Sequence, residues 1–157
     1  MTVIDSHLHL FKANSKDYPR PVHPGLADED REVLARDLIT KMEKAGVDKA
    51  IVVPLGPEDH YLSELQEEYP GKFAAVGIYD ADAPDQAENL DRRIEESSIQ
   101  GIRVGFVDQE AGVNDDPEKY ELFPLFQAMA ERGLKVWFYA ESCLLYTSPS
   151  PRDFEAS

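Results

Sequence analysis

Short apolar runs and amphipathic stretches alternate along residues 1–142. The apolar runs are rich in β-branched and aromatic residues and predict strands, whereas the stretches with apolar residues three or four positions apart predict helices. The predicted strands span residues 3–10, 49–55, 73–79, 99–107 and 134–140, and the predicted helices span residues 32–44, 61–69, 85–96 and 122–132. This alternation predicts a parallel sheet with right-handed crossovers.

Two architectures have this order of elements. One is the N-terminal part, about five strands, of a (β/α)8 TIM barrel, and the other is a flavodoxin-like five-stranded sheet. The chain of 157 residues is too short for a complete barrel, which needs about 250 residues. The turn after the first predicted strand lacks a glycine-rich phosphate loop and carries histidines instead. We therefore predict the α/β class with the partial-barrel arrangement.

The first predicted strand carries the segment Asp5-Ser6-His7-Leu8-His9. Because side chains alternate along a strand, Asp5, His7 and His9 share one face. In a barrel this face is the interior, and active sites lie at the carboxyl ends of the strands. Two imidazoles at such a position can bind one divalent ion, although histidines at a strand end are also found with hydrogen-bonding roles alone. We predict His7 and His9 as ligands of a divalent metal cofactor, zinc or a similar ion.

Five segments then resemble, in this order, segments of one known family: VIDSHLHLF, AGVDKAIVVPLGPEDHYL, FAAVGIYDAD, QGIRVGF and FQAMAERGLKVWFYA. They cover nearly all of residues 2–141 and look like the amidohydrolase-related family. This branch of the amidohydrolase superfamily includes sugar-acid lactonases, dicarboxylate lactonases and some decarboxylases. The resemblance implies a (β/α)8 barrel that hydrolyses a lactone, ester or amide, often with one divalent metal. His7 and His9 match the ligand pair on the first strand of that family.

The chain departs from the family pattern at the fifth strand. Many relatives have another ligand there, often a histidine, where this chain reads Val136-Trp137-Phe138-Tyr139-Ala140. The resemblance places further ligands, and the aspartate that deprotonates the attacking water, on later strands. Lactonase branches with the same histidine pair dispense with metal, so the resemblance leaves the metal requirement open.

Arg103 lies between Gly101 and Gly105 on the fourth predicted strand. A guanidinium on a buried strand has to be paired, because an unpaired buried charge is costly. One hypothesis makes Arg103 a catalytic residue that clamps a substrate carboxylate or carbonyl oxygen. The alternative is an internal ion pair with a carboxylate such as Asp80. The sequence leaves both open.

Three further residues are candidates for the pocket. His60 follows the second predicted strand on the side of the sheet where loops line a barrel pocket, and Tyr139 lies on the fifth strand with the same parity as Trp137. We predict both as substrate-binding residues. The alternative for His60 is a surface position at a helix start, and the alternative for Tyr139 is core packing. His23 is interpreted as a loop residue only, although it lies in a loop of the kind that can close over a barrel mouth.

Residues 143–157 differ from the rest of the chain. From Cys143 to Asp153 the sequence reads CLLYTSPSPRD, and every residue matches the translation of a transposase-type sequencing-library adapter. A natural linker rich in serine and proline is the alternative. We predict a partial barrel over residues 1–142 and a non-native, disordered tail over residues 143–157. The single cysteine falls in this tail, so no internal disulfide or cysteine-based zinc cluster is expected.

The formal net charge of −15 argues against nucleic acid and anionic membranes as partners, since both require clustered Lys and Arg. No apolar run has the length of a membrane span, and the N-terminal residues do not resemble a signal peptide. The sequence therefore predicts a cytoplasmic protein with a small-molecule substrate, and it leaves the oligomeric state undetermined.

Together these features predict a hydrolase acting on a lactone or related carbonyl substrate, with a sugar-acid lactone as one candidate. A metal-bound or base-activated water would attack the carbonyl, and an ion or Arg103 would stabilise the oxyanion. The alternatives are a metal-dependent non-oxidative decarboxylase of the same superfamily and a non-catalytic flavodoxin-like binding protein. The 157-residue chain by itself is expected not to be a competent enzyme.

Overall fold

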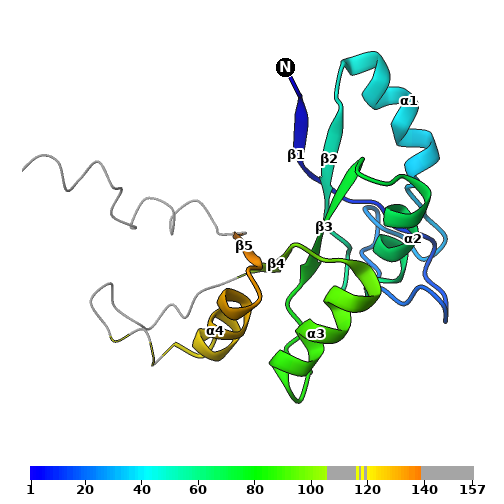
Figure 1. The fold of residues 1–157 in the computed structure, drawn as a ribbon. Helices are drawn as coiled ribbons and strands as arrows, with labels where there is room; N and C mark the ends of the chain where they lie inside the picture. The colour runs from blue at the N-terminus through cyan, green and yellow to red at the C-terminus, as the bar shows by residue number, and fades with distance from the viewer. Residues whose placement is uncertain (106–115, 117, 119, 139–157) are drawn as a thin grey trace, which may run out of the picture.

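The computed structural model describes residues 1–105, 116, 118 and 120–138, in which five strands alternate with four helices (Figure 1). The strands are β1 (Ile4–Leu8), β2 (Lys49–Val52), β3 (Phe73–Ile78), β4 (Gly101–Val104) and β5 (Lys135–Phe138). The helices are α1 (Ala35–Ala45), α2 (His60–Glu68), α3 (Gln86–Ser97) and α4 (Phe123–Glu131). Within these residues, none of the helices is long and apolar enough to cross a membrane.

The strands form one parallel sheet in the sequential order β1-β2-β3-β4-β5. A flavodoxin-like sheet has the order 2-1-3-4-5, so that alternative is wrong. The sheet is strongly curved. The evidence is the contact between its first and last strands, where the indole nitrogen of Trp137 on β5 lies 3.1 Å from Nδ1 of His7 on β1. In a flat sheet the first and fifth strands would be about 19 Å apart at about 4.8 Å per strand. The predicted partial TIM barrel is confirmed as a half-barrel.

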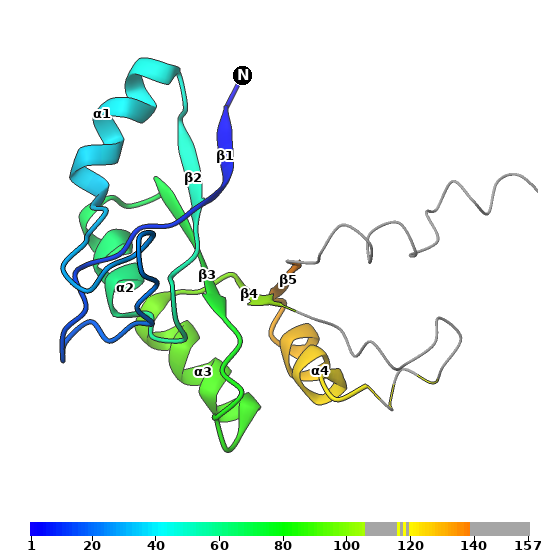
Figure 2. The same cartoon turned by 180° about the vertical axis from the view of Figure 1, so that it is seen from behind.

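The helices lie on the convex side of the sheet (Figures 1 and 2). The main core fills the layer between them and the strands, where burial of apolar side chains stabilises the fold. Both β2 and β4 contribute fully buried residues to this layer, as expected for parallel strands covered by crossover helices. The side chains at its centre are Val52, Ile102 and Val104 from the sheet and Leu62, Leu65, Leu90 and Met129 from the helices.

Several elements are shorter than the sequence pattern predicts. β1 ends at Leu8 rather than at residue 10, because the chain leaves the sheet and the backbone of Phe11 pairs with Val33 instead. α1 begins at Ala35 rather than at residue 32, after this pairing ends. The predicted helix stops are confirmed at Gly46 and Gly133, whose φ angles of 69° and 67° are left-handed.

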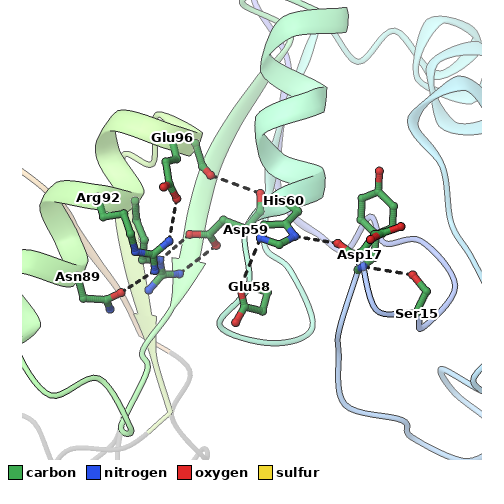
Figure 3. Close-up of polar contacts among 11 residues, drawn as sticks. Ser15, Asp17, Glu58, Asp59, His60, Asn89, Arg92 and Glu96 are labelled. Carbon is green, nitrogen blue, oxygen red and sulfur yellow. Dashed lines mark hydrogen bonds and ion pairs between the residues drawn. The ribbon is translucent and has the colours of Figure 1, made fainter.

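A buried ion pair that the sequence analysis did not predict joins Asp59, the residue before α2, to Arg93 on α3. Arg93 donates from Nε and Nη2 to the two carboxylate oxygens of Asp59 at 2.5 and 2.9 Å, and the side chains are 2% and 3% exposed. Its Nη1 donates to the carbonyl oxygen of Ile78 at 2.8 Å. A Cβ at Gly77 would overlap the guanidinium, so this glycine leaves the space that Arg93 occupies. Asp59 is labelled in Figure 3, where dashed lines mark the polar contacts.

Candidate functional site

His7 on β1 and His9 just beyond it turn their rings toward each other. Their Nε2 atoms are 3.3 Å apart, and the rings meet edge to face with centroids 4.9 Å apart. Nδ1 of His9 lies 2.9 Å from the carbonyl oxygen of Val53. A carbonyl only accepts hydrogen bonds, so Nδ1 of His9 carries the proton and Nε2 keeps its lone pair. The chain that follows β2 thus orients His9.

Trp137 on β5 contacts His7. Its Nε1–H donates to Nδ1 of His7 at 3.1 Å, and the two rings stack with centroids 6.3 Å apart. An indole nitrogen only donates, so Nδ1 of His7 is the acceptor and Nε2 of the neutral ring carries the proton. The result is a one-way chain of hydrogen bonds from Trp137 through His7 and His9 to Val53.

The electrostatic surroundings favour a neutral His7. Burial lowers the pKa of His7 below its ordinary value, and the charges of His9 and Arg103 lower it further. Asp5 acts in the opposite direction and raises this pKa. The Asp5 carboxylate also accepts the backbone N–H of His7 at 3.0 Å. The neutral ring required by the hydrogen-bond chain is therefore the form that the site favours.

A cavity of about 710 Å³ opens beside the pair at the carboxyl ends of the strands. Its polar lining comes from the strand ends and from the loop over residues 9–34, and it comprises His9, His23, Arg31 and Arg103. Its apolar lining includes Phe11, Val33, Leu55 and Ile78. Two guanidinium groups in one cavity are suited to a substrate that carries a carboxylate.

Arg20 holds together the loop that forms one wall of this cavity. Its guanidinium donates to six backbone carbonyl oxygens at 2.7 to 3.4 Å, those of Lys12, Pro21, Ala27, Asp28, Glu29 and Arg31. The planar fork of arginine suits this task because its N–H groups point in several fixed directions. The loop has no regular period, so the sequence carried no sign of this role.

Arg103 lies on β4. Its side chain is half-buried and lines the cavity, while Gly101, Ile102 and Val104 on the same strand are buried. In the register of β4 with β5 it is the partner of Trp137. The choice between a substrate clamp and an internal ion pair stays a prediction. Tyr139 lies outside the described residues.

His60 does not line the cavity beside the histidine pair. It begins α2 and lines a different, smaller cavity beside Tyr18 and Tyr61. Its Nδ1 lies 2.8 Å from the carbonyl oxygen of Asp17, and its Nε2 lies 3.7 Å from the Glu58 carboxylate (Figure 3). A substrate contact by His60 stays a prediction.

The geometry of the pair fits two ligands of one ion. Two nitrogens bound to a tetrahedral zinc at about 2.0–2.1 Å lie about 3.4 Å apart, close to the observed 3.3 Å. His9 also donates its other N–H to a carbonyl, as metal-bound histidines usually do. His7 differs, because its other nitrogen accepts a hydrogen bond from Trp137. Among the described residues no group of three or more His, Cys, Asp or Glu side chains could hold a metal.

Two residues have roles in this site that the sequence analysis missed. Arg31 lines the cavity from an irregular loop, where no pattern points to it. Trp137 entered the sequence analysis only through the strand parity that it shares with Tyr139, and its hydrogen bond to His7 depends on the curvature of the sheet.

The fold is the N-terminal half of a parallel α/β barrel, with two histidines at the carboxyl end of β1 and an arginine near that of β4. The family model for amidohydrolases matches residues 4–155, and the chain belongs to this family. The relationship inferred from the sequence motifs is therefore confirmed. A search of the curated proteins finds no match.

Solved structures share the fold. A protein assigned as a 2-pyrone-4,6-dicarboxylic acid hydrolase from Pseudomonas putida is 20% identical with a TM-score of 0.60, over 88% of this chain and 48% of that one. An amidohydrolase from Burkholderia multivorans is 23% identical with a TM-score of 0.60, over 87% and 47%. A 5-carboxyvanillate decarboxylase from Novosphingobium aromaticivorans, with bound manganese, is 17% identical with a TM-score of 0.60, over 88% and 50%. The chain thus spans about half the length of these structures.

Proposed function

We propose that the complete barrel containing these strands is a hydrolase acting on a lactone or related carbonyl substrate that carries a carboxylate. A sugar-acid lactone is one candidate. The observation that carries the proposal is the convergence of His7, His9 and Arg103 at the carboxyl ends of the strands, His9 and Arg103 lining one cavity. The likeness of the fold to a dicarboxylic acid hydrolase supports the substrate class.

Each residue of this site has a chemical role in the proposal. Arg103, with Arg31 from the loop that lines the same cavity, binds the substrate carboxylate or the carbonyl oxygen, where positive charge also stabilises a developing oxyanion. His7 presents an N–H donor at Nε2, and His9 presents an acceptor at Nε2. Once the hydrogen bond between the two rings opens, His7 can donate to the carbonyl oxygen and His9 can accept from the attacking water.

A divalent ion, zinc or similar, would be held by Nε2 of His7 and His9. Such an ion polarises a carbonyl and lowers the pKa of a bound water. We place the base that deprotonates the water, and any further ligands, outside the described residues. Elemental analysis of the complete protein beside a His7→Asn/His9→Asn variant tests the ligand assignment. Equal metal content in both proteins would remove the pair from the ligand set.

A non-oxidative decarboxylase is the second candidate. The cavity with two guanidinium groups would hold the carboxylate of such a substrate equally well, and the fold is shared with a decarboxylase. The two reactions are distinguished by their products, because lactone hydrolysis releases an acid without gas whereas decarboxylation releases carbon dioxide.

The test is a substrate panel with the complete protein, comprising sugar-acid lactones, carboxylated pyrones and aromatic carboxylic acids. Acid release is followed at constant pH, and carbon dioxide is measured in parallel. The proposal expects acid release to dominate and Arg103→Met to lower turnover by orders of magnitude without a lower melting temperature. Arg36→Met, at an exposed arginine on α1, is the matched control, and it should keep most of the turnover.

Two results would contradict this assignment. Arg103→Met with unchanged specific activity and a lower melting temperature would identify Arg103 as an internal ion-pair residue, for which a loss of roughly 3–5 kcal/mol is expected. Dominant carbon dioxide release would replace the hydrolase with the decarboxylase.

A further inference from the structure

The hydrogen bonds around the histidine pair all run in one direction. Trp137 donates to Nδ1 of His7 at 3.1 Å, the Nε2 atoms of His7 and His9 are 3.3 Å apart, and Nδ1 of His9 lies 2.9 Å from the carbonyl oxygen of Val53. The indole can only donate and the carbonyl can only accept. With these two ends fixed, each neutral ring has one possible position for its proton, which is Nε2 in His7 and Nδ1 in His9.

The two rings are therefore not equivalent toward a divalent ion. A histidine binds a metal through a nitrogen lone pair, and its other nitrogen usually donates to a carbonyl, a carboxylate or water. His9 already has this arrangement, with Val53 as the acceptor. His7 has the reverse arrangement, because Trp137 places a donor where a metal-bound histidine needs an acceptor. Its proton occupies the nitrogen that faces His9.

We infer that Trp137 is a positioning residue that selects the tautomer of His7 and thereby weakens metal binding by the histidine pair. It keeps the proton on Nε2, so His7 offers a donor toward His9 and the cavity and withholds its lone pair from an ion. Binding an ion through Nε2 of His7 requires the proton to move to Nδ1 and the Trp137 hydrogen bond to break. This inference concerns the pair alone and stands independently of the reaction proposed above.

The position of Trp137 supports a selective role. It belongs to β5, whereas His7 belongs to β1 at the opposite side of the half-barrel, and the two rings stack with an interplanar angle of 29°. The side chain is half-buried, in contrast to its neighbour Phe138, which is 48% exposed. Trp137 is also the single tryptophan of the chain, so its fluorescence reports on this contact alone.

The first test reads the tautomer directly. In the dilute chain labelled with ¹⁵N-histidine, long-range proton–nitrogen spectra are recorded about two pH units above the ordinary histidine pKa of about 6.5. The expected result is an Nε2-protonated His7, and a shift toward the Nδ1-protonated form in Trp137→Phe. Phe138→Leu, which also shortens an aromatic side chain on β5, should leave the His7 tautomer unchanged. An Nδ1-protonated His7 in the unmodified chain would overturn the inference without any variant.

The second test measures zinc affinity by competition with a chromophoric chelator. Zinc binding through Nε2 of His7 breaks the hydrogen bond from Trp137, so Trp137→Phe should bind zinc about two- to tenfold more tightly. The zinc affinity of Phe138→Leu should be unchanged. His7→Asn/His9→Asn is the reference without a site. If Trp137→Phe does not fold, the fluorescence emission of Trp137 in the unmodified chain tests the same inference. Zinc binding should move this emission to longer wavelength, since the indole N–H is released. Equal zinc affinity of the folded variant, or an unchanged emission at saturating zinc, would refute the role.

Discussion

Two arginines in neighbouring layers of the molecule have opposite surroundings. Arg93 is 2% exposed and uses both sides of its guanidinium on Asp59 and Ile78. Arg103 is half-buried and lines the cavity beside His9. Arg93 makes three hydrogen bonds inside the core, which indicates a role in folding, whereas Arg103 lines a cavity and is the arginine that the proposed function assigns to the substrate. The sequence drew attention to Arg103 and not to Arg93.

Replacement of Arg93 by methionine should strongly destabilise the fold. The Asp59 carboxylate would remain buried without its partner, and loss of one member of such a pair costs roughly 3–5 kcal/mol. Urea denaturation followed by far-UV circular dichroism measures the change in unfolding free energy. Arg92→Met is the matched control, because Arg92 is exposed and bonds to Asn89 and Glu96 on its own helix. Similar losses in the two variants would argue against this account of the buried pair.

Between elements, polar side chains organise the loop over residues 9–34 and add an ion pair to the contact of α3 with α4. Arg20 joins separate parts of the loop through backbone carbonyls, and the bridge between Phe11 and Val33 closes its base. Since this loop forms a wall of the cavity, its order bears directly on the site.

Arg20→Lys should loosen the loop while the sheet stays folded. Lysine keeps the charge but cannot reach several carbonyls at fixed angles, so the loop backbone loses its shared donor. Limited proteolysis should then give first cuts within residues 12–32, much faster than in the unmodified chain. Arg36→Lys, at an exposed arginine on α1, serves as the control and should leave the cleavage pattern unchanged. A protected loop in Arg20→Lys would show that other contacts hold it.

The ion pair between Asp91 on α3 and Arg132 at the end of α4 should make a pH-dependent contribution to stability. Hydrogen bonds from Arg132 at 2.6 and 2.8 Å lower the pKa of Asp91 below its ordinary 3.8. Its contribution is therefore fully present above that value and is lost as the pH falls through the lowered pKa. Asp91→Asn should melt below the unmodified chain at neutral pH, and the difference should shrink under acid conditions. Glu95→Gln, at an exposed carboxylate of the same helix, controls for the change in net charge. A melting-temperature difference between Asp91→Asn and the unmodified chain that stays constant at all pH values would contradict the prediction.

For the whole molecule, the main feature is a curved sheet with two open sides. Within the described residues β1 pairs only with β2, and β5 pairs only with β4. Both carry exposed apolar side chains, with Ile4 53% and Phe138 48% exposed. Unpaired strands with exposed apolar residues are templates for association with other chains.

The 157-residue chain, expressed by itself, should self-associate and show no lactone hydrolysis above background. The open strands favour association, and among the described residues the histidine pair has no further side chains that complete a metal site of three or more donors. Analytical ultracentrifugation measures the association, and the substrate panel measures activity. Replacing Phe138 by lysine on the open strand should reduce association if that strand is the template. A monomeric, cooperatively melting chain with measurable lactone hydrolysis would show that this picture is wrong.

The sequence by itself determined the class and order of the elements and the identity of the histidine pair. Local signals are sufficient for these features, because apolar period, helix-ending glycines and strand parity depend on residues close together in the chain. They predicted the stops at Gly46 and Gly133 and the shared face of His7 and His9, and the structure has both. The motifs also led to the family that the comparison confirms.

Only the tertiary structure decided which contacts form between distant parts of the chain, including the contact of Trp137 with the histidine pair. The contacts of Arg93 with Asp59, of Trp137 with His7 and of Arg20 with its loop join positions that are distant in sequence or lack any period. The curvature of five strands brings β5 to β1, and without it Trp137 would lie beyond hydrogen-bonding reach of His7. The proton positions on His7 and His9 follow from donors and acceptors supplied by other strands, and no local pattern of residues encodes them.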